Sequence, residues 1–205
     1  MTSPAEESTR QRILREGTRL VRRKGLTATS ISDLVEAAEI QRGSLYHYFS
    51  GKHELALAIL QQAAEQFLDF LRRSLVGESP RERLHSFLNA AAEKKCAEES
   101  VGACIFGNTA LEASDSDPEL AAIVRNLFDE WAATLQPVID EGQQQGEFRE
   151  DMPSEMLARH IVIVLEGGLM QTRLRQDEEP FRQSIQCIKA FLEGNTDDDT
   201  EETDA

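Results

Sequence analysis

Apolar residues recur every three or four positions along nearly the whole chain, and no segment alternates apolar with polar residues as a half-buried strand does. In the first such segment, Ile13, Leu14, Leu20 and Val21 share one face of a helix, and arginines occupy the other. The spacing therefore predicts an all-α fold. The expected elements are about nine helices, over residues 9–24, 31–38, 41–48, 52–75, 81–97, 105–113, 118–145, 153–175 and 180–193.

The second and third predicted helices are short and are separated by only about three residues. Ser30 and Asp33 form a capping box that starts the second helix, and Ser50 is the expected N-cap of the long helix after the pair. Two short helices joined by so tight a turn are typical of a helix-turn-helix, whose second helix fits the DNA major groove. We expect a three-helix DNA-binding domain over residues 1–52, a ligand-sensing and dimerisation domain over residues 53–194, and an acidic disordered tail over residues 195–205.

Charge is distributed unevenly along the chain. The formal net charge is −15, yet residues 1–52 carry nine Lys/Arg against six Asp/Glu, which leaves −18 for the rest. A basic module on an acidic body is a workable arrangement for binding phosphates locally. The sequence shows no membrane-spanning apolar run, no signal-peptide core, and three cysteines without the spacing of a metal site. We therefore expect a cytoplasmic protein with no membrane partner, no metal and no cofactor.

The segment TATSISDLVEAAEIQRGSLYHYFSGKHEL, residues 27–55, resembles the DNA-binding domain of the TetR family of regulators. The resemblance implies a homodimer that reads a palindromic operator in double-stranded DNA, usually as a repressor that a small molecule releases. By position, the resemblance assigns phosphate or base contacts to most of the polar residues here and close backbone approach to Gly43. The candidate DNA-binding residues are Ser30, Gln41, Arg42, Gly43, Ser44, Tyr46, His47 and Lys52. Leu45, Tyr48 and Phe49 match positions that pack the recognition helix on its own domain.

Two residues depart from the family pattern. Glu39 stands where the family usually has glycine, so either the turn is slightly strained or its geometry differs; a non-glycine residue at positive φ costs roughly 1 kcal/mol. Gln41 replaces the usual Ser or Thr N-cap of the recognition helix, and its amide could instead pair with adenine. If these changes prevent the DNA-binding domain (residues 1–52, called the reader below) from binding DNA, the chain is an interaction protein that has lost operator binding.

The C-terminal part resembles one sensor subgroup of the same family through the Gly102–Asn108 segment and Glu166-Gly167-Gly168, without naming a ligand. The effector is therefore an unknown small molecule. Candidate residues of a ligand pocket between the central helices are Cys104, Phe106, Glu112, Phe128, Trp131, His160, Ile163 and Met170. Each apolar member taken alone is more often a core residue than a pocket residue.

The last two helices are the expected dimer helices, forming a four-helix contact about a two-fold axis. The candidate interface residues are Leu157, Ile161, Leu165, Gly168, Ile185, Ile188 and Phe191. The alternative is that these apolar stripes pack only within one subunit.

Cys104 precedes a predicted helix whose N-terminal dipole favours a thiolate, so an electrophile- or oxidant-sensing regulator is an alternative function. A buried, inert cysteine is the commoner outcome. An enzyme is the remaining class, but the sequence holds no nucleophile elbow, P-loop, H-E-x-x-H or dinucleotide glycine motif. We therefore expect a regulator rather than an enzyme.

Overall fold

The computed structural model describes residues 8–96 and 104–194, and within these ranges the chain forms nine helices and no strand. The helices are α1 (Thr9–Lys24), α2 (Ile31–Ala37), α3 (Arg42–Tyr48), α4 (Lys52–Ser74), α5 (Pro80–Cys96), α6 (Ile105–Ala113), α7 (Pro118–Gln144), α8 (Ser154–Arg175) and α9 (Glu179–Glu193). The predicted all-α fold is confirmed, and each helix end lies within one residue of its prediction. The expected tail over 195–205 lies outside the described residues. None of the described helices is long and apolar enough to cross a membrane.

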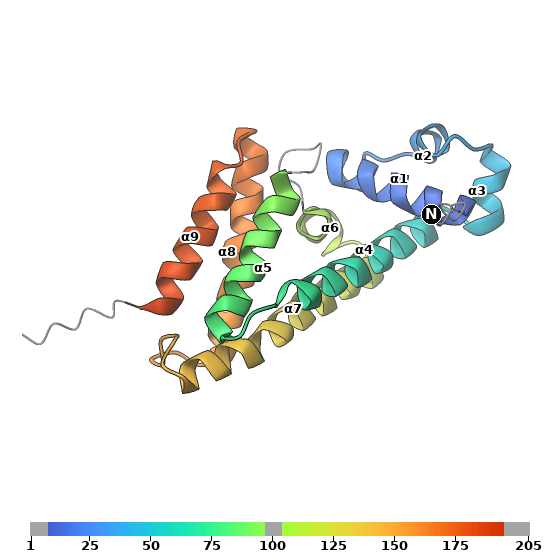
Figure 1. Ribbon diagram of the computed structural model, residues 1–205. Coiled ribbons are helices and arrows are strands. Elements are labelled where there is room, and N and C mark those ends of the chain that lie inside the picture. Colours follow the sequence, from blue (N-terminus) through green and yellow to red (C-terminus); the bar gives the residue numbers. More distant parts are fainter. Residues whose placement is uncertain (1–7, 97–103, 195–205) are drawn as a thin grey trace, which may run out of the picture.

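Helices α1, α2 and α3 gather at one end of the molecule (Figure 1). Ser8 and Gln11 form a capping box at the start of α1, and Gly25, at φ 88°, ends the helix. Gly17 lets α1 approach α4 closely, because a Cβ on this residue would lie 2.5 Å from Cδ1 of Ile59. The first turns of α4 thus complete the packing of the helix-turn-helix.

Gly51, and not Ser50, is the N-cap of α4. The backbone N–H and the hydroxyl of Ser50 both donate to Oε2 of Glu54, at 2.7 and 2.6 Å. The predicted cap was therefore wrong by one residue, because the Ser50 side chain binds a carboxylate in the first turn instead of a backbone N–H.

Helix α4 leads from the helix-turn-helix into the C-terminal helices and runs beside α7 (Figure 1). Helix α7 also packs against α5, α6 and α8, and α8 packs against α9. Buried apolar side chains from α1 through α9 join in one continuous core, so the reader helices and the C-terminal helices are in direct contact.

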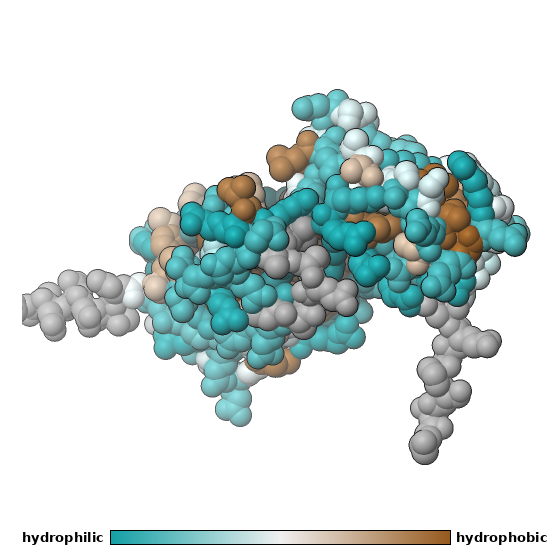
Figure 2. Space-filling model, turned by 90° about the horizontal axis from the view of Figure 1, so that it is seen from above, coloured by the Kyte–Doolittle hydropathy of each residue, from teal (hydrophilic) through white to brown (hydrophobic). Residues whose placement is uncertain are grey.

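The surface seen from above is mostly hydrophilic, with separate hydrophobic patches (Figure 2). Half of the exposed large apolar side chains in the described part of the chain belong to a single helix, α8. These are Met156, Ile163, Met170 and Leu174.

Candidate functional site

The turn between α2 and α3 is built around Glu39, at φ 51°. Its N–H donates to the carbonyl of Glu36, and the N–H of Ile40 donates to the carbonyl of Val35, each at 3.1 Å. The first of the two expectations for Glu39 is therefore correct: the turn keeps a left-handed residue and carries the strain of a side chain there.

Helix α3 is anchored by its apolar side and presents its polar side to solvent. Leu45 and Phe49 are buried, whereas Gln41, Arg42, Gly43, Tyr46 and His47 are exposed and Ser44 is half-buried. The side chain of Gln41 makes no capping hydrogen bond. The structure thus leaves donors and acceptors on one side of a short helix available to an outside partner.

Tyr48 differs from its predicted packing role. It is 38% exposed, and its ring meets the ring of His47 edge-on at a centroid distance of 5.0 Å. Leu45 and Phe49 fill the interior positions of this helix, so Tyr48 stays on the exposed side with His47.

Gly43 faces open space: no atom outside its immediate neighbours lies within 4 Å of the position a Cβ would take. The packing of the protein itself therefore does not require a glycine here. The guanidinium of Arg42 lies 5.9 Å from the ring centroid of Tyr46 on the same exposed side. A glycine between exposed polar side chains suits close approach of a phosphate backbone.

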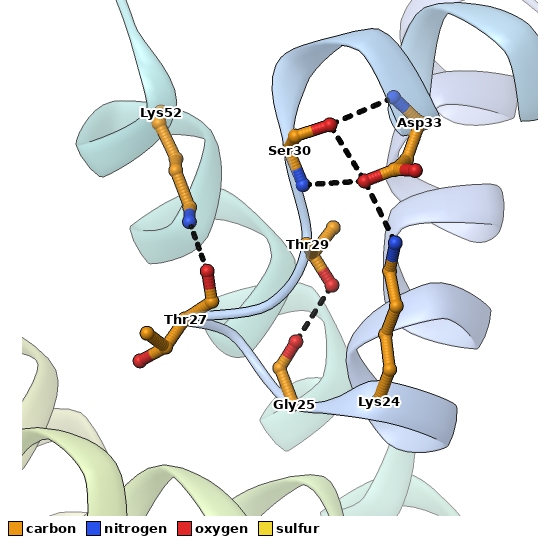
Figure 3. A network of polar contacts seen from close by, with 7 residues as sticks. All are labelled: Lys24, Gly25, Thr27, Thr29, Ser30, Asp33 and Lys52. Carbon is orange, nitrogen blue, oxygen red and sulfur yellow. Dashed lines mark hydrogen bonds and ion pairs between the residues drawn. The ribbon is translucent and has the colours of Figure 1, made fainter.

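Ser30 and Asp33 form the predicted capping box, and Lys24 joins it (Figure 3). The Ser30 hydroxyl donates to Oδ2 of Asp33 at 2.6 Å and accepts from the Asp33 N–H at 3.1 Å. Nζ of Lys24 lies 2.7 Å from the same Oδ2. Lys24 and the two Ser30 donors hold the pKa of Asp33 far below its usual range. This network fixes the start of α2.

Lys52 and Thr29 fix the loop between α1 and α2 (Figure 3). Nζ of Lys52 donates to the carbonyl of Thr27 at 3.0 Å, and the buried Thr29 hydroxyl donates to the carbonyl of Gly25 at 2.6 Å. An ammonium has three donors, so this bond leaves Lys52 able to reach a phosphate as well.

Glu112 lies where the reader helices meet α6, and not in the interior cavity for which it was a candidate. Its Oε2 accepts a hydrogen bond of 2.6 Å from the N–H of Thr27. Arg173 of α8 adds a second contact, donating to Oδ1 of Asn108 at 2.7 Å and to the carbonyl of Arg23 at 3.5 Å. The sequence contained no indication of this junction, because the residues that bond across it lie 85 and 150 positions apart along the chain.

A cavity of about 120 Å³ opens between α1, α4, α5, α6, α7, α8 and α9. Of the candidate pocket residues, Cys104, Phe106 and Trp131 line it. The cavity is rich in aromatic rings and also receives basic side chains and one carboxyl group. Its further lining includes Phe67, Phe70, Phe87, Arg22, Lys94, Lys95 and Glu166. Sequence reasoning missed Glu166 as a pocket residue and noted it only beside the Gly167-Gly168 pair.

The other candidate pocket residues do not line this cavity. Phe128 packs against the ring of Trp131 at a centroid distance of 6.5 Å, and the ring of His160 lies 4.7 Å from that of Phe191 on α9. Ile163 and Met170 are 68% and 57% exposed. Helix α8 is apolar on more than one side, so its sequence pattern did not show which side faces inward.

Cys104 is the N-cap of α6 and contacts Glu166. Burial, followed by the charge of Glu166, raises the pKa of Cys104 well above its usual value, although backbone N–H groups of α6 act in the opposite direction. The start of α6 thus acts in the expected direction, but desolvation outweighs it and keeps the thiol neutral, which agrees with the buried, inert cysteine expected as the commoner outcome.

Most candidate dimer residues are buried within one subunit. Leu157, Ile161, Leu165, Ile185 and Ile188 are each at most 5% exposed. Gly168 is buried as well, and a Cβ on it would collide with the Ser184 side chain of α9. Phe191 is half-buried beneath the guanidinium of Arg149, 4.3 Å from its ring centroid. These stripes join α8 to α9 within the subunit, which was the alternative interpretation.

Comparisons with known proteins agree with this architecture. The family described as "Bacterial regulatory proteins, tetR family" matches residues 13–59, and "Tetracyclin repressor-like, C-terminal domain" matches residues 80–188. The HTH-type transcriptional repressor DhaR of Mycobacterium sp. strain GP1 is 24% identical over 201 residues, which cover 97% of this chain and 100% of DhaR. The HTH-type transcriptional repressor NemR of Escherichia coli K12 is 24% identical over 199 residues, covering 94% of this chain and 98% of NemR.

Solved structures show the same fold. The regulatory protein TetR from Rhodobacter sphaeroides matches with a TM-score of 0.83 at 23% identity, over 90% of this chain and 98% of that chain. A TetR transcriptional regulator from Chloroflexus aurantiacus matches with a TM-score of 0.78 at 29% identity, over 88% and 92%. The exposed recognition helix and the cavity agree with these matches. The chain belongs to the TetR family of ligand-responsive, DNA-binding transcriptional regulators.

Proposed function

We propose that this regulator is a repressor that binds a palindromic operator as a homodimer and is released when a small molecule enters its interior cavity. The observation that supports DNA binding is the exposed side of α3, which carries Arg42, Tyr46 and His47 together with the open space at Gly43. Such a helix fits the major groove with its backbone close to the DNA. The proposed role involves no catalytic chemistry.

The exposed apolar residues of α8 support the dimer. Met156, Ile163, Met170 and Leu174 are spaced by seven, seven and four residues, which places them along one side of the helix. Gly167, whose Cβ position is open, lies on the same helix and allows close approach of a second backbone. Exposed apolar side chains along one side of a helix mark a partner surface, and a two-fold axis pairs that side with itself. This stripe replaces the buried residues that the sequence suggested.

Helices α4 and α6 both connect the cavity to the DNA-binding helices. Cys104, Ile105 and Phe106 of the α6 start line the cavity, and Glu112 near its end binds Thr27. Helix α4 lines the cavity with Phe67 and begins at Lys52, directly after the helix-turn-helix. A ligand that binds one arrangement of α4 and α6 better than another shifts the separation of the two recognition helices.

Sensing through Cys104 is the less supported mechanism, because its raised pKa keeps the thiol protonated and weakly nucleophilic. Loss of operator binding is also less supported, because Glu39 is accommodated in the turn and the polar side of α3 is exposed.

The test is selection of bound sequences from a random duplex pool with the purified full chain, followed by titration against salt. We expect one inverted repeat whose affinity falls steeply as salt rises. Arg42→Ala should weaken binding to that repeat by at least about tenfold, whereas Arg125→Ala, an exposed arginine on α7, should leave it unchanged. Recovery of no sequence at low salt would contradict the proposal.

A further inference from the structure

One carboxyl group in the cavity has no partner for one of its oxygens. Oε1 of Glu166 is buried and, among the described residues, makes no hydrogen bond. Trp131, which lines the same cavity, has a buried indole N–H in the same condition. Buried polar atoms nearly always have a hydrogen-bond partner. Two such atoms without a partner, on residues that line the same empty space, therefore indicate where a ligand supplies the missing hydrogen bonds.

The fold holds the Glu166 carboxyl group in place. Helix α8 points it toward the start of α6, where a Cβ on Gly107 would lie 2.6 Å from Oε2. The Cys104 thiol hydrogen-bonds to the carboxyl and acts to lower its pKa. One oxygen is therefore positioned against α6, and the other is left for the cavity.

The charge of Glu166 is not balanced by the basic side chains of the cavity. Burial raises the pKa of Glu166 to about 7, and the only opposing cause is the Cys104 hydrogen bond. Arg22, Lys94 and Lys95 also line the cavity, but each already has an interaction within the protein. For Lys94 one such contact is with the ring of Phe70, 4.2 Å from the centroid. The cavity therefore lacks a cationic group that donates a hydrogen bond to Glu166.

The walls around this carboxyl suit an apolar body and a positive charge. The rings of Phe67 and Trp131 meet at 4.6 Å, and those of Phe87 and Phe106 lie within 6.5 Å of this pair. Aromatic faces attract a cation, and a cavity of about 120 Å³ is close to the size that holds one benzene ring.

We propose that the effector is a small organic amine with a ring-sized apolar body, whose protonated nitrogen donates a hydrogen bond to Oε1 of Glu166. This inference rests on the proposed function, because it names the ligand class of the cavity that the repressor is proposed to sense. Any acceptor atom on the same molecule can pair with the indole N–H of Trp131.

Trp131 makes the test direct, because it is the only tryptophan of the chain and it lines the cavity. Its fluorescence is titrated at pH 8, without DNA, with four probes of nearly equal size: benzylamine, benzyl alcohol, toluene and benzoate. We expect benzylamine to bind at least about tenfold more tightly than any of the other three, as a charge-assisted hydrogen bond requires. In Glu166→Gln this preference should disappear, whereas Glu155→Gln, an exposed site on the same helix, should keep it.

The proposal is overturned if no amine binding is detected at millimolar concentration, if toluene or benzoate binds best, or if Glu166→Gln retains the amine preference. Circular dichroism of each variant checks that it folds. Operator binding is measured separately on the same proteins. A protein that binds its operator but not benzylamine would overturn only the ligand class, whereas one that binds benzylamine through Glu166 and never binds an operator would overturn only the proposed function.

Discussion

The carboxylate of Glu112, near the end of α6, accepts a 2.6 Å hydrogen bond from the backbone N–H of Thr27, in the loop between α1 and α2. Gly25 in the same loop lies so close that a Cβ there would collide with Oε1 of Glu112. The helix that starts at the cavity therefore ends on the loop that positions α2.

Glu112→Ala should weaken the coupling between the cavity and the reader. Without the carboxylate, movement of α6 is no longer passed to Thr27, so a saturating effector should change operator affinity by a smaller factor than in the parent. Effector affinity without DNA should stay within about twofold, because Glu112 does not line the cavity. Leu111→Ala, at the neighbouring 85% exposed position, is the control. An unchanged factor in Glu112→Ala would show that coupling does not pass through the Glu112–Thr27 hydrogen bond.

Gly43→Ala should weaken DNA binding without lowering the stability of the fold. Alanine favours a helix over glycine by up to about 1 kcal/mol, and the open space at Gly43 accepts a methyl group. Thermal unfolding should therefore occur at the same or a higher temperature. Affinity for the operator should fall by about tenfold, because the methyl group separates α3 from the DNA. A variant with undiminished operator affinity would show that the backbone of α3 does not approach the DNA at this residue.

Ile163→Glu should turn the proposed homodimer into a monomer. Ile163 is 68% exposed in the subunit, so its replacement costs little folding energy, but a charge in the middle of the apolar α8 stripe opposes burial against a second copy. Sedimentation velocity at micromolar concentration is the measurement. The control is Leu111→Glu, because Leu111 is equally apolar and more exposed but lies on α6. Two variants with the same oligomeric state would place the interface elsewhere.

Glu166 should make the stability of the unliganded protein depend on pH. Its folded pKa of about 7 lies above the ordinary value of 4.5, so the folded state binds the proton more tightly than the unfolded state. The resulting penalty is absent below pH 4.5, grows as pH rises toward 7 and is then constant, at most about 3 kcal/mol. Urea unfolding should therefore show Glu166→Gln gaining stability over the parent between pH 5 and pH 8. Glu155→Gln, an exposed site on the same helix, is the matched control.

The same carboxyl should make amine binding depend on pH. The described titratable groups that line the cavity with Glu166 are Arg22 on α1, Lys94 and Lys95 on α5, and Cys104 at the start of α6; the lining residues from α4, α7 and α9 carry no charge. Cys104, whose pKa burial raises well above its usual value, stays neutral from pH 6 to pH 8. Benzylamine affinity should therefore rise by up to about tenfold from pH 6 to pH 8 as Glu166 ionises, and Trp131 fluorescence measures it. A pH-independent affinity would contradict ionisation of Glu166 in this interval.

Local sequence was sufficient for the helices and for the reader. The Ser30–Asp33 box, the glycine after α1 and the spacing of Leu45 and Phe49 act over three or four residues, and the structure forms each of them. At Glu39 the sequence left two outcomes open, a slightly strained turn or a different turn geometry, and the structure has the positive φ of the first.

The orientation of α8 was decided by tertiary packing. Leu157 and Ile161 face the core while Met156 and Ile163 face outward, although all four are apolar and lie within two turns. A helix that is apolar on several sides gives no periodic signal for its inward face, so the buried stripe was mistaken for the dimer surface.

What the sequence by itself determined about this protein is its all-helical fold, its helix ends and its recognition helix, because these depend on hydrogen bonds and side-chain spacing within a few residues. Only the tertiary structure decided that Glu112 binds Thr27, that Oε1 of Glu166 finds no hydrogen-bond partner among the described residues, and that one side of α8 remains exposed. Each of these depends on which distant helices come together, and burial removes the water that would otherwise satisfy a carboxylate.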